Sequence, residues 1–124
     1  MIEGYSLNVA VGANTPIPFN NTTIQKGCSA VKAGTSSFEL NKKGVYMVAF
    51  DSSTGTASTV QLYKNGVAQP QAQTIGTGSL GFYTLVQVPQ DNTTCCCTSP
   101  TLVQVMNTSP STFSNANVCI TKVC

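Results

Sequence analysis

The chain has 124 residues and few charges: Lys and Arg together number 6, Asp and Glu 4, and charged residues make up 8% of the sequence, against a typical fraction of about 25%. This length suits a single domain, which we place at residues 1–124, with a hydrophobic core that needs no disulfide. Low charge gives little repulsion between copies, and scattered lysines without any arginine argue against nucleic-acid binding.

Short β-rich runs alternate with turn residues along the whole chain, and no segment has the period of a helix. Such a series predicts a sandwich or barrel of antiparallel strands, which places the chain in the all-β class. The predicted strands are, in chain order, Tyr5–Val11, Ile17–Asn20, Ser36–Leu40, Val45–Asp51, Thr59–Lys64, Phe82–Val88, Leu102–Met106 and Val118–Val123.

Two of the turn signals carry specific predictions. Asn65-Gly66 favours a type I′ hairpin because both residues tolerate positive φ, so we expect the chain to reverse there and a strand to begin at Val67. The segment Thr74–Ser79 is rich in Gly and Thr, and this composition predicts a flexible loop.

Alternation along the strands predicts which side chains share a face. Val45–Asp51 is apolar on both faces, and Phe82–Val88 carries Tyr83 and Leu85 opposite a second apolar face. A strand of this kind lies between two layers or is covered by another subunit. In Thr59–Lys64, by contrast, Val60 and Leu62 alternate with Gln61 and Tyr63, which predicts a half-exposed strand.

The groups that most enzymes use are missing from this sequence. It contains no histidine, its four carboxylates are scattered, and it has no glycine loop of the kind that holds phosphates. Calcium sites need clustered acidic oxygens, which are also missing. We therefore expect no enzymatic activity, no catalytic residue, no metal and no cofactor.

Six cysteines are the chemically distinctive feature: Cys28, Cys95, Cys96, Cys97, Cys119 and Cys124. A zinc site is one interpretation, but the separated C-x2-C spacing of zinc ligands is absent. A catalytic thiol lacks an activating histidine. Disulfides or packed free thiols are favoured, with Cys124 and the triplet as preferred partners and Cys28 as a further one. Contacts between triplets of neighbouring subunits also remain open.

The N-terminal residues lack the basic segment and apolar run of a secretory signal. No stretch approaches the roughly 20 apolar residues of a membrane helix. We therefore expect synthesis in the cytoplasm and no membrane partner.

Several motifs follow one another in an order known from one superfamily. The most specific are the strand opening Gly44-Val45-Tyr46 and the hairpin Lys64-Asn65-Gly66. The others are Ile17-Pro18-Phe19, Phe38-Glu39-Leu40, Leu85-Val86-Gln87-Val88 and the run from Asn117 to Val123. Together they cover nearly the entire chain and resemble the TNF/C1q-like jelly rolls. This resemblance implies a two-sheet antiparallel jelly-roll sandwich, a tight homotrimer, and neither catalysis nor a cofactor.

Within that superfamily the chain is most similar to the C-terminal domain of the collagen-like exosporium glycoprotein of spores and to short phage head-fibre or capsid decoration proteins. The cysteine triplet and the Cys-terminated last strand resemble small proteins of phages that infect Gram-positive gut bacteria. The chain has no Gly-x-y stalk, which argues against the spore-coat role. In a trimer, neighbours would cover the strands that are apolar on both faces. The candidate interface residues are Tyr5, Tyr83, Leu85 and Phe113, and lining the core of the single chain is the alternative for each.

The leading hypothesis is a structural virion protein of a bacteriophage. It would be made in the host bacterial cytoplasm and mounted on the capsid surface, where it reinforces the capsid or presents an adhesive surface. Its partners would be itself and the major capsid protein or another virion protein. The alternative is a trimeric module on a phage fibre or a bacterial spore surface that binds a receptor or a host-surface or mucosal glycan through loop residues, of which the candidates are Asn14, Asn65, Asn92 and Tyr83. A third hypothesis is a cysteine-based metal or redox protein.

Overall fold

The structure is a computed structural model that describes residues 1–89 and 101–124. The described residues form nine β-strands and contain no helix that could cross a membrane. The all-β prediction is therefore confirmed. The strands are β1 (Ile2–Val11), β2 (Thr15–Pro16), β3 (Asn21–Gln25), β4 (Ala30–Lys32), β5 (Phe38–Leu40), β6 (Gly44–Lys64), β7 (Val67–Val88), β8 (Thr101–Asn107) and β9 (Ser111–Lys122).

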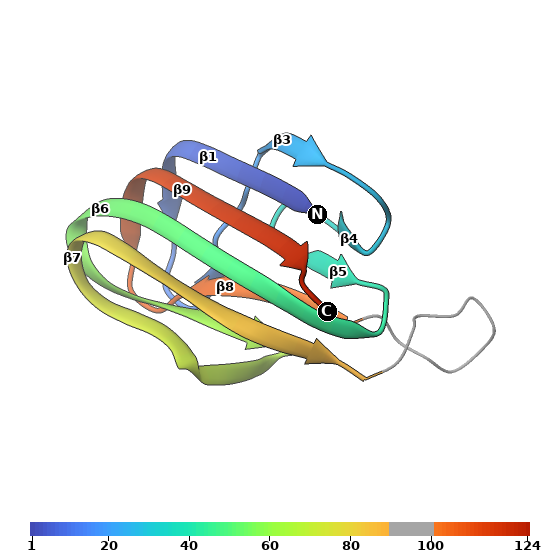
Figure 1. The fold of residues 1–124 in the computed structure, drawn as a ribbon. Coiled ribbons are helices and arrows are strands. Elements are labelled where there is room, and N and C mark those ends of the chain that lie inside the picture. The colour runs from blue at the N-terminus through green and yellow to red at the C-terminus, as the bar shows by residue number, and fades with distance from the viewer. Residues whose placement is uncertain (90–100) are drawn as a thin grey trace.

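The strands pair into one antiparallel sheet that folds over into two layers (Figure 1). In the first layer β3 pairs with β1, β1 with β9, and β9 with the early part of β6, Tyr46–Thr54. In the second layer β8 pairs with β5 and with the late part of β6, Val60–Lys64. β7 follows β6 through both layers. Because β6 and β7 belong to both layers, this single hairpin joins them.

The β6–β7 hairpin bends where it passes from one layer to the other. The pairing register shifts between Thr54 and Ser58, while on the opposite strand Gly76 and Gly78 have φ of 150° and 93°. Glycine adopts such angles without the cost that a Cβ would add. The prediction of a flexible loop over Thr74–Ser79 is wrong, because this segment remains paired within β7. Its glycines bend a strand and do not interrupt it.

The predicted hairpin at Asn65-Gly66 is confirmed. The two residues have φ of 51° and 79°, and Lys64 pairs with Val67 on either side of them. The Asn65 side chain also accepts a hydrogen bond of 2.8 Å from the Leu102 backbone N–H. The turn residues therefore fix the hairpin and tie its tip to β8.

The predicted strand Ile17–Asn20 does not form regular pairing. Ile17 and Phe19 are fully buried, so the alternation is present, and each donates one backbone hydrogen bond, to Val105 and Thr35 respectively. The neighbouring prolines at positions 16 and 18 have no N–H to contribute to a ladder. The segment therefore packs into the core as an irregular connection between β2 and β3.

Aromatic rings fill the space between the layers. Phe19 lies 5.7 Å from Phe38 and 6.2 Å from Phe50, measured between ring centroids, and Phe50 lies 5.4 Å from Phe82. These residues come from both layers and from the irregular connection, so the core depends on all three being in place.

A buried asparagine closes one end of the sandwich. Asn107 is fully buried at the end of β8, where its amide N–H groups reach the backbone carbonyls of Val11, Gly12 and Ser109. Its side-chain oxygen accepts a hydrogen bond from the Ser58 hydroxyl. One amide thus links β1, β6, β8 and the turn before β9. Nothing in the sequence distinguished this asparagine from those in loops.

Candidate functional site

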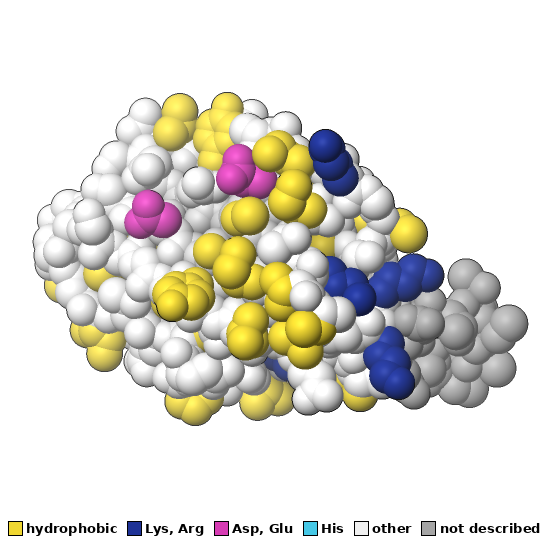
Figure 2. All heavy atoms as spheres, viewed as in Figure 1, with side chains coloured by type: hydrophobic (Ala, Val, Ile, Leu, Met, Phe, Trp, Pro, Cys, Tyr) yellow, Lys and Arg dark blue, Asp and Glu magenta, His cyan; other side chains and the backbone are white. Residues whose placement is uncertain are grey.

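The outer surface of the first layer carries a continuous group of apolar side chains. Figure 2 shows hydrophobic side chains running as a band across this surface. We call it the apolar face, and it consists of Tyr5, Leu7, Val45, Met47, Ala49, Tyr83, Leu85 and Cys119. They come from β1, β6, β7 and β9, which are adjacent strands of the sheet.

The pairing register places these side chains next to one another. Tyr83 is opposite Ala49, Ala49 is opposite Cys119, and Leu85 is opposite Met47. Residues directly opposite on neighbouring antiparallel strands point to the same side and touch. The members on β6, β7 and β9 therefore form one contiguous surface, while Tyr5 and Leu7 on β1 lie opposite Asn117 and Asn115 of β9.

The largest members of the apolar face are unusually exposed for their type. Tyr83 is 76% exposed, Leu85 60% and Leu7 61%. The side chains between them on β6 are half-buried. A contiguous exposed apolar surface marks a site of association, and aromatic residues are enriched in such sites.

A groove lies in the same layer, at the edge opposite to the one that carries Tyr83 and Leu85. It has a volume of about 410 Å³ and runs beside β1, between β3 and β9. At its wall the Thr23 hydroxyl donates a hydrogen bond of 2.7 Å to the Glu3 carboxylate. The lining residues are Glu3, Tyr5, Leu7, Thr23, Asn115, Ala116 and Asn117. The layer thus has protruding apolar side chains at its β7 edge and a depression towards its β3 edge.

Three of the four predicted interface residues lie on the apolar face: Tyr5, Tyr83 and Leu85. Phe113 does not, because it is fully buried in the core. The cause is an irregularity where β9 pairs with β6 between Ser53 and Thr54, which changes the alternation of β9 and turns Phe113 inwards. When faces are assigned by strict alternation along the sequence, such a shift in pairing is not taken into account.

The predicted glycan-contact residues do not come together. Asn14, with φ of 53°, lies in the turn after β1, whereas Asn65 lies at the tip of the β6–β7 hairpin and bonds to Leu102. Tyr83 belongs to the apolar face. Asn92 lies outside the described residues. No single loop site therefore unites the described members of this set.

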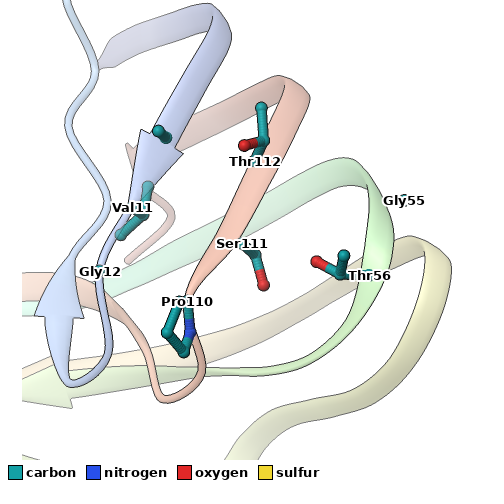
Figure 3. A pocket seen from close by; sticks show the side chains of 8 residues that line it. Val11, Gly12, Gly55, Thr56, Pro110, Ser111 and Thr112 are labelled. Carbon is teal, nitrogen blue, oxygen red and sulfur yellow. The ribbon is translucent and has the colours of Figure 1, made fainter.

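A second cavity, which no sequence pattern indicated, lies at the end that Asn107 closes (Figure 3). It is open and has a volume of about 550 Å³. In Figure 3 the side chains of Thr56, Pro110 and Ser111 surround it. Its lining contains only small, uncharged residues: Ala10, Val11, Gly12, Gly55, Thr56, Pro110, Ser111 and Thr112.

The cysteines within the described residues are free thiols: Cys28, Cys119 and Cys124. Cys28 and Cys124 are exposed, while Cys119 lies half-buried on the apolar face. Desolvation by burial raises the pKa of the Cys119 thiol, the negative charge of Glu3 raises it further, and the N-terminal ammonium opposes both. The net effect of these groups favours the thiol form of Cys119.

The cysteine triplet lies outside the described residues, because Cys95, Cys96 and Cys97 fall in the segment 90–100. The disulfides predicted for the triplet therefore lie outside them as well. Within residues 1–89 and 101–124 no group of three or more His, Cys, Asp or Glu side chains is placed to hold a metal ion.

Solved structures with the same architecture cover nearly the whole chain. The globular domain of the zebrafish complement 1qA protein matches with a TM-score of 0.77 at 11% identity, covering 99% of this chain and 96% of that one. Murine APRIL matches with a TM-score of 0.63 at 10% identity, covering 98% of each chain. The vertex protein P5 of PRD1 matches with a TM-score of 0.65 at 11% identity, covering 99% of this chain and 96% of that one.

No family model and no curated protein sequence matches the chain. At identities this low the structural matches establish the fold alone. They confirm the expected TNF/C1q-like jelly roll, an antiparallel two-layer sandwich, over almost all residues. A virus vertex protein is among the proteins that share it.

Proposed function

We propose that this protein is a non-enzymatic structural module that assembles into a homotrimer through its apolar face and is mounted on a bacteriophage virion as a capsid decoration or head-fibre protein. The single observation that carries the proposal is the contiguous apolar face with Tyr83 and Leu85 exposed at its edge. A surface of this kind is unfavourable in water unless another molecule covers it.

The shape of the first layer favours a ring of copies over a twofold dimer. A twofold interface brings a patch against itself, whereas a ring brings two different patches together. The protruding Tyr83 and Leu85 lie at the β7 edge, and the groove beside Tyr5 lies towards the β3 edge. In the proposed ring, the β7 edge of each copy enters the groove of the next. A ring of three follows from the resemblance to TNF/C1q-like jelly rolls.

The virion role rests on the vertex protein of phage PRD1, which has the same fold, together with the sequence resemblance to phage decoration proteins. Low charge, which allows close association of copies, agrees with it. In this role the partners are the module itself and the major capsid protein or another virion protein. The location is the capsid surface.

The homotrimer is tested by the mass of the folded protein in solution. Light scattering is expected to give about three times the chain mass of 12.9 kDa at micromolar concentration. A mass equal to one chain, under conditions in which circular dichroism shows the protein to be folded, would rule out the homotrimer.

The virion role is tested separately by particle association. Particles made by a host that expresses the protein are purified by density gradient, and the protein is expected in the particle band at a fixed ratio to the major capsid protein. Its complete absence from purified particles would contradict the virion role and leave the homotrimer untouched.

A second candidate function is binding of a host-surface or mucosal glycan, and the cavity at the Asn107 end is the observation that favours it. That cavity offers the hydroxyl groups of Thr56, Ser111 and Thr112 beside small apolar surfaces, a combination that can hydrogen-bond to a neutral ligand. A glycan array probed with wild-type protein and with a Ser111→Leu variant tests this function. Signal that the variant loses supports it, and a wild-type signal equal to background contradicts it.

A further inference from the structure

Charged side chains are distributed unevenly between the two ends of the sandwich. Four segments meet at the end that Asn107 closes, and none of them contains Asp, Glu or Lys: residues 8–16, 52–58, 74–80 and 107–115. Their meeting is fixed by pairing, since Val11 lies opposite Ser111, Thr15 opposite Asn107 and Thr54 opposite Gly78. We call this the uncharged end.

Lysines gather at the other end, which Figure 2 shows as a group of dark blue side chains. Lys26 adjoins Met1, because each donates a backbone hydrogen bond of 2.8 Å to the other's carbonyl. Lys122 lies two residues beyond Ile120, which pairs with Ile2 at the start of β1. Lys42 lies in the turn that leads into β6. All three are exposed, and we call the surface that they form the lysine end.

Contacts tie these three lysines to the same end of the molecule. The Lys122 ammonium donates a hydrogen bond of 2.8 Å to the terminal oxygen of Cys124, the last residue of the sequence, and this oxygen also accepts from Val45 N–H at 3.3 Å. Val45 follows the turn that carries Lys42. From the second layer the Lys64 ammonium reaches the Gln87 carbonyl, and Gln87 pairs with Val45. Positive charge from both layers therefore converges here.

The three exposed lysines are not neutralised by acidic side chains within the described part of the chain. The Glu3 carboxylate is hydrogen-bonded to Thr23 on the apolar-face side, and Glu39 lies within β5. No side-chain carboxylate of residues 1–89 or 101–124 pairs with Lys26, Lys42 or Lys122. Even with the terminal oxygen of Cys124 beside Lys122, the described residues of the lysine end carry a net positive charge, to which the Met1 ammonium adds.

The homotrimer proposed above would concentrate this charge, and the present inference rests on it. Cyclic symmetry keeps every copy pointing the same way along the rotation axis. The apolar face lies along the side of the strands, so association through it leaves both ends of each copy free. The three lysine ends would therefore lie together on one side of the trimer and the three uncharged ends on the other.

We infer that the lysine end is the surface by which the module is seated on another protein, and that the partner surface is rich in aspartate and glutamate. Lysine ammonium groups are point charges that pair with carboxylates in many geometries. A nucleic acid fits less well, because a phosphate backbone requires a dense row of cations and this end carries a few lysines from separate elements. Three equivalent contacts strengthen the attachment by multivalency. The uncharged end, with its open cavity, then faces outwards.

Binding to immobilised poly-L-glutamate tests this inference, with polyphosphate as a second probe. The wild-type protein is expected to bind poly-L-glutamate in low salt and to bind about tenfold more weakly when salt is raised above 0.3 M, because salt screens charge pairs. A variant with Lys26→Gln, Lys42→Gln and Lys122→Gln is expected to lose at least that much affinity. The solution mass of every sample is measured alongside.

A matched control variant moves the three positive charges to the uncharged end and keeps the net charge of the wild-type protein. It adds Thr56→Lys, Thr77→Lys and Thr112→Lys to the Gln variant, all at exposed positions of the uncharged end. Weak binding by this control supports the lysine end as a site, whereas recovery of wild-type binding shows a net-charge effect and overturns it. Stronger binding to polyphosphate than to poly-L-glutamate overturns the acidic-protein partner. A trimeric mass without binding contradicts this inference alone, and a single-chain mass contradicts the homotrimer.

Discussion

The two outer surfaces of the sandwich are built by the same hairpin and differ in chemistry. In the first layer β6 and β7 present Met47, Ala49, Tyr83 and Leu85 outwards. In the second layer the same two strands present Gln61 opposite Gln73, with Tyr63 close by and the exposed Ile75 beside the bend. The contrast is local, because it reverses within single strands at the bend near Gly76.

Physical chemistry assigns different surroundings to the two surfaces. Glutamine side chains hydrogen-bond to water at little cost, and a single exposed apolar residue such as Ile75 is ordinary on a protein surface, so the second-layer surface is stable when exposed. Tyrosine and leucine at more than half exposure leave apolar area in water, and covering that area releases free energy. The first-layer surface is therefore the one that another copy is expected to cover.

The largest effect is expected from placing a carboxylate on each of the two surfaces in turn. Tyr83→Glu puts a charge into the proposed interface three times per trimer, where burial without a partner is costly. We expect the solution mass to fall from three chains to one. The matched control is Gln73→Glu, the same new residue on the same strand but in the second layer, and it should leave the mass unchanged. An unchanged mass in both variants would contradict assembly through the apolar face.

The next test asks whether both surfaces depend on one framework. Asn107→Ala removes an amide that serves the carbonyls of Val11, Gly12 and Ser109 as well as the Ser58 hydroxyl. Leaving such buried groups unpaired costs about 1–3 kcal/mol. We expect the free energy of unfolding from denaturant titration to fall by that amount, while the folded fraction keeps its mass. The control is Gln71→Ala at an exposed position, for which no measurable change is expected.

A smaller effect is expected at the turn that joins the two strands. Gly66 has φ of 79°, and a Cβ built there meets no atom within 4 Å, so Gly66→Ala adds conformational strain without a clash. The left-handed conformation costs an alanine about 1–2 kcal/mol. Gly34→Ala is the matched control, because a Cβ built at Gly34 also meets no atom within 4 Å and Gly34 has no positive φ. The free energy of unfolding of this variant should equal that of the wild-type protein. Equal stability of the two variants in denaturant titration would contradict strain at Gly66.

Features determined by local chemistry were predicted from the sequence, and those determined by pairing were not. The Asn65-Gly66 hairpin follows from two adjacent residues. Alternation along the strand predicts that Val86 and Tyr83 point to opposite faces of β7. The inward position of Phe113 depends on an irregularity in pairing with β6, and the bend at Gly76 depends on a partner strand. No local pattern in the sequence contains that information.

The candidate site divides in the same way. Tyr83 and Leu85 could be chosen because their strand is apolar on both faces. The groove beside Tyr5 and the lysine end could not, since each is assembled from segments that are distant in the sequence. A scattered set of lysines looks like ordinary solvated surface until the topology brings Lys26 and Lys122 to one end.

Thiol labelling gives the finest test of the contrast, because Cys119 lies on the apolar face and Cys28 lies off it. Alkylation requires the thiolate, and burial together with Glu3 raises the pKa of Cys119. A thiol with a raised pKa keeps its proton up to a higher pH. Labelling of Cys119 should therefore begin at a higher pH than labelling of a cysteine in an unstructured peptide. Glu3→Gln removes the negative charge and should move this onset to lower pH.

Assembly should slow the labelling of Cys119 further at every pH, because a neighbouring copy covers it, while leaving Cys28 accessible. The Tyr83→Glu variant separates the two causes: it should restore access to Cys119 but keep the raised onset, since Glu3 remains opposite Cys119 in the sheet. Peptide mass spectrometry measures both sites in one sample. Equal labelling rates of Cys119 in the wild-type protein and in Tyr83→Glu would show that no copy covers the apolar face, even if a trimer forms elsewhere on the molecule.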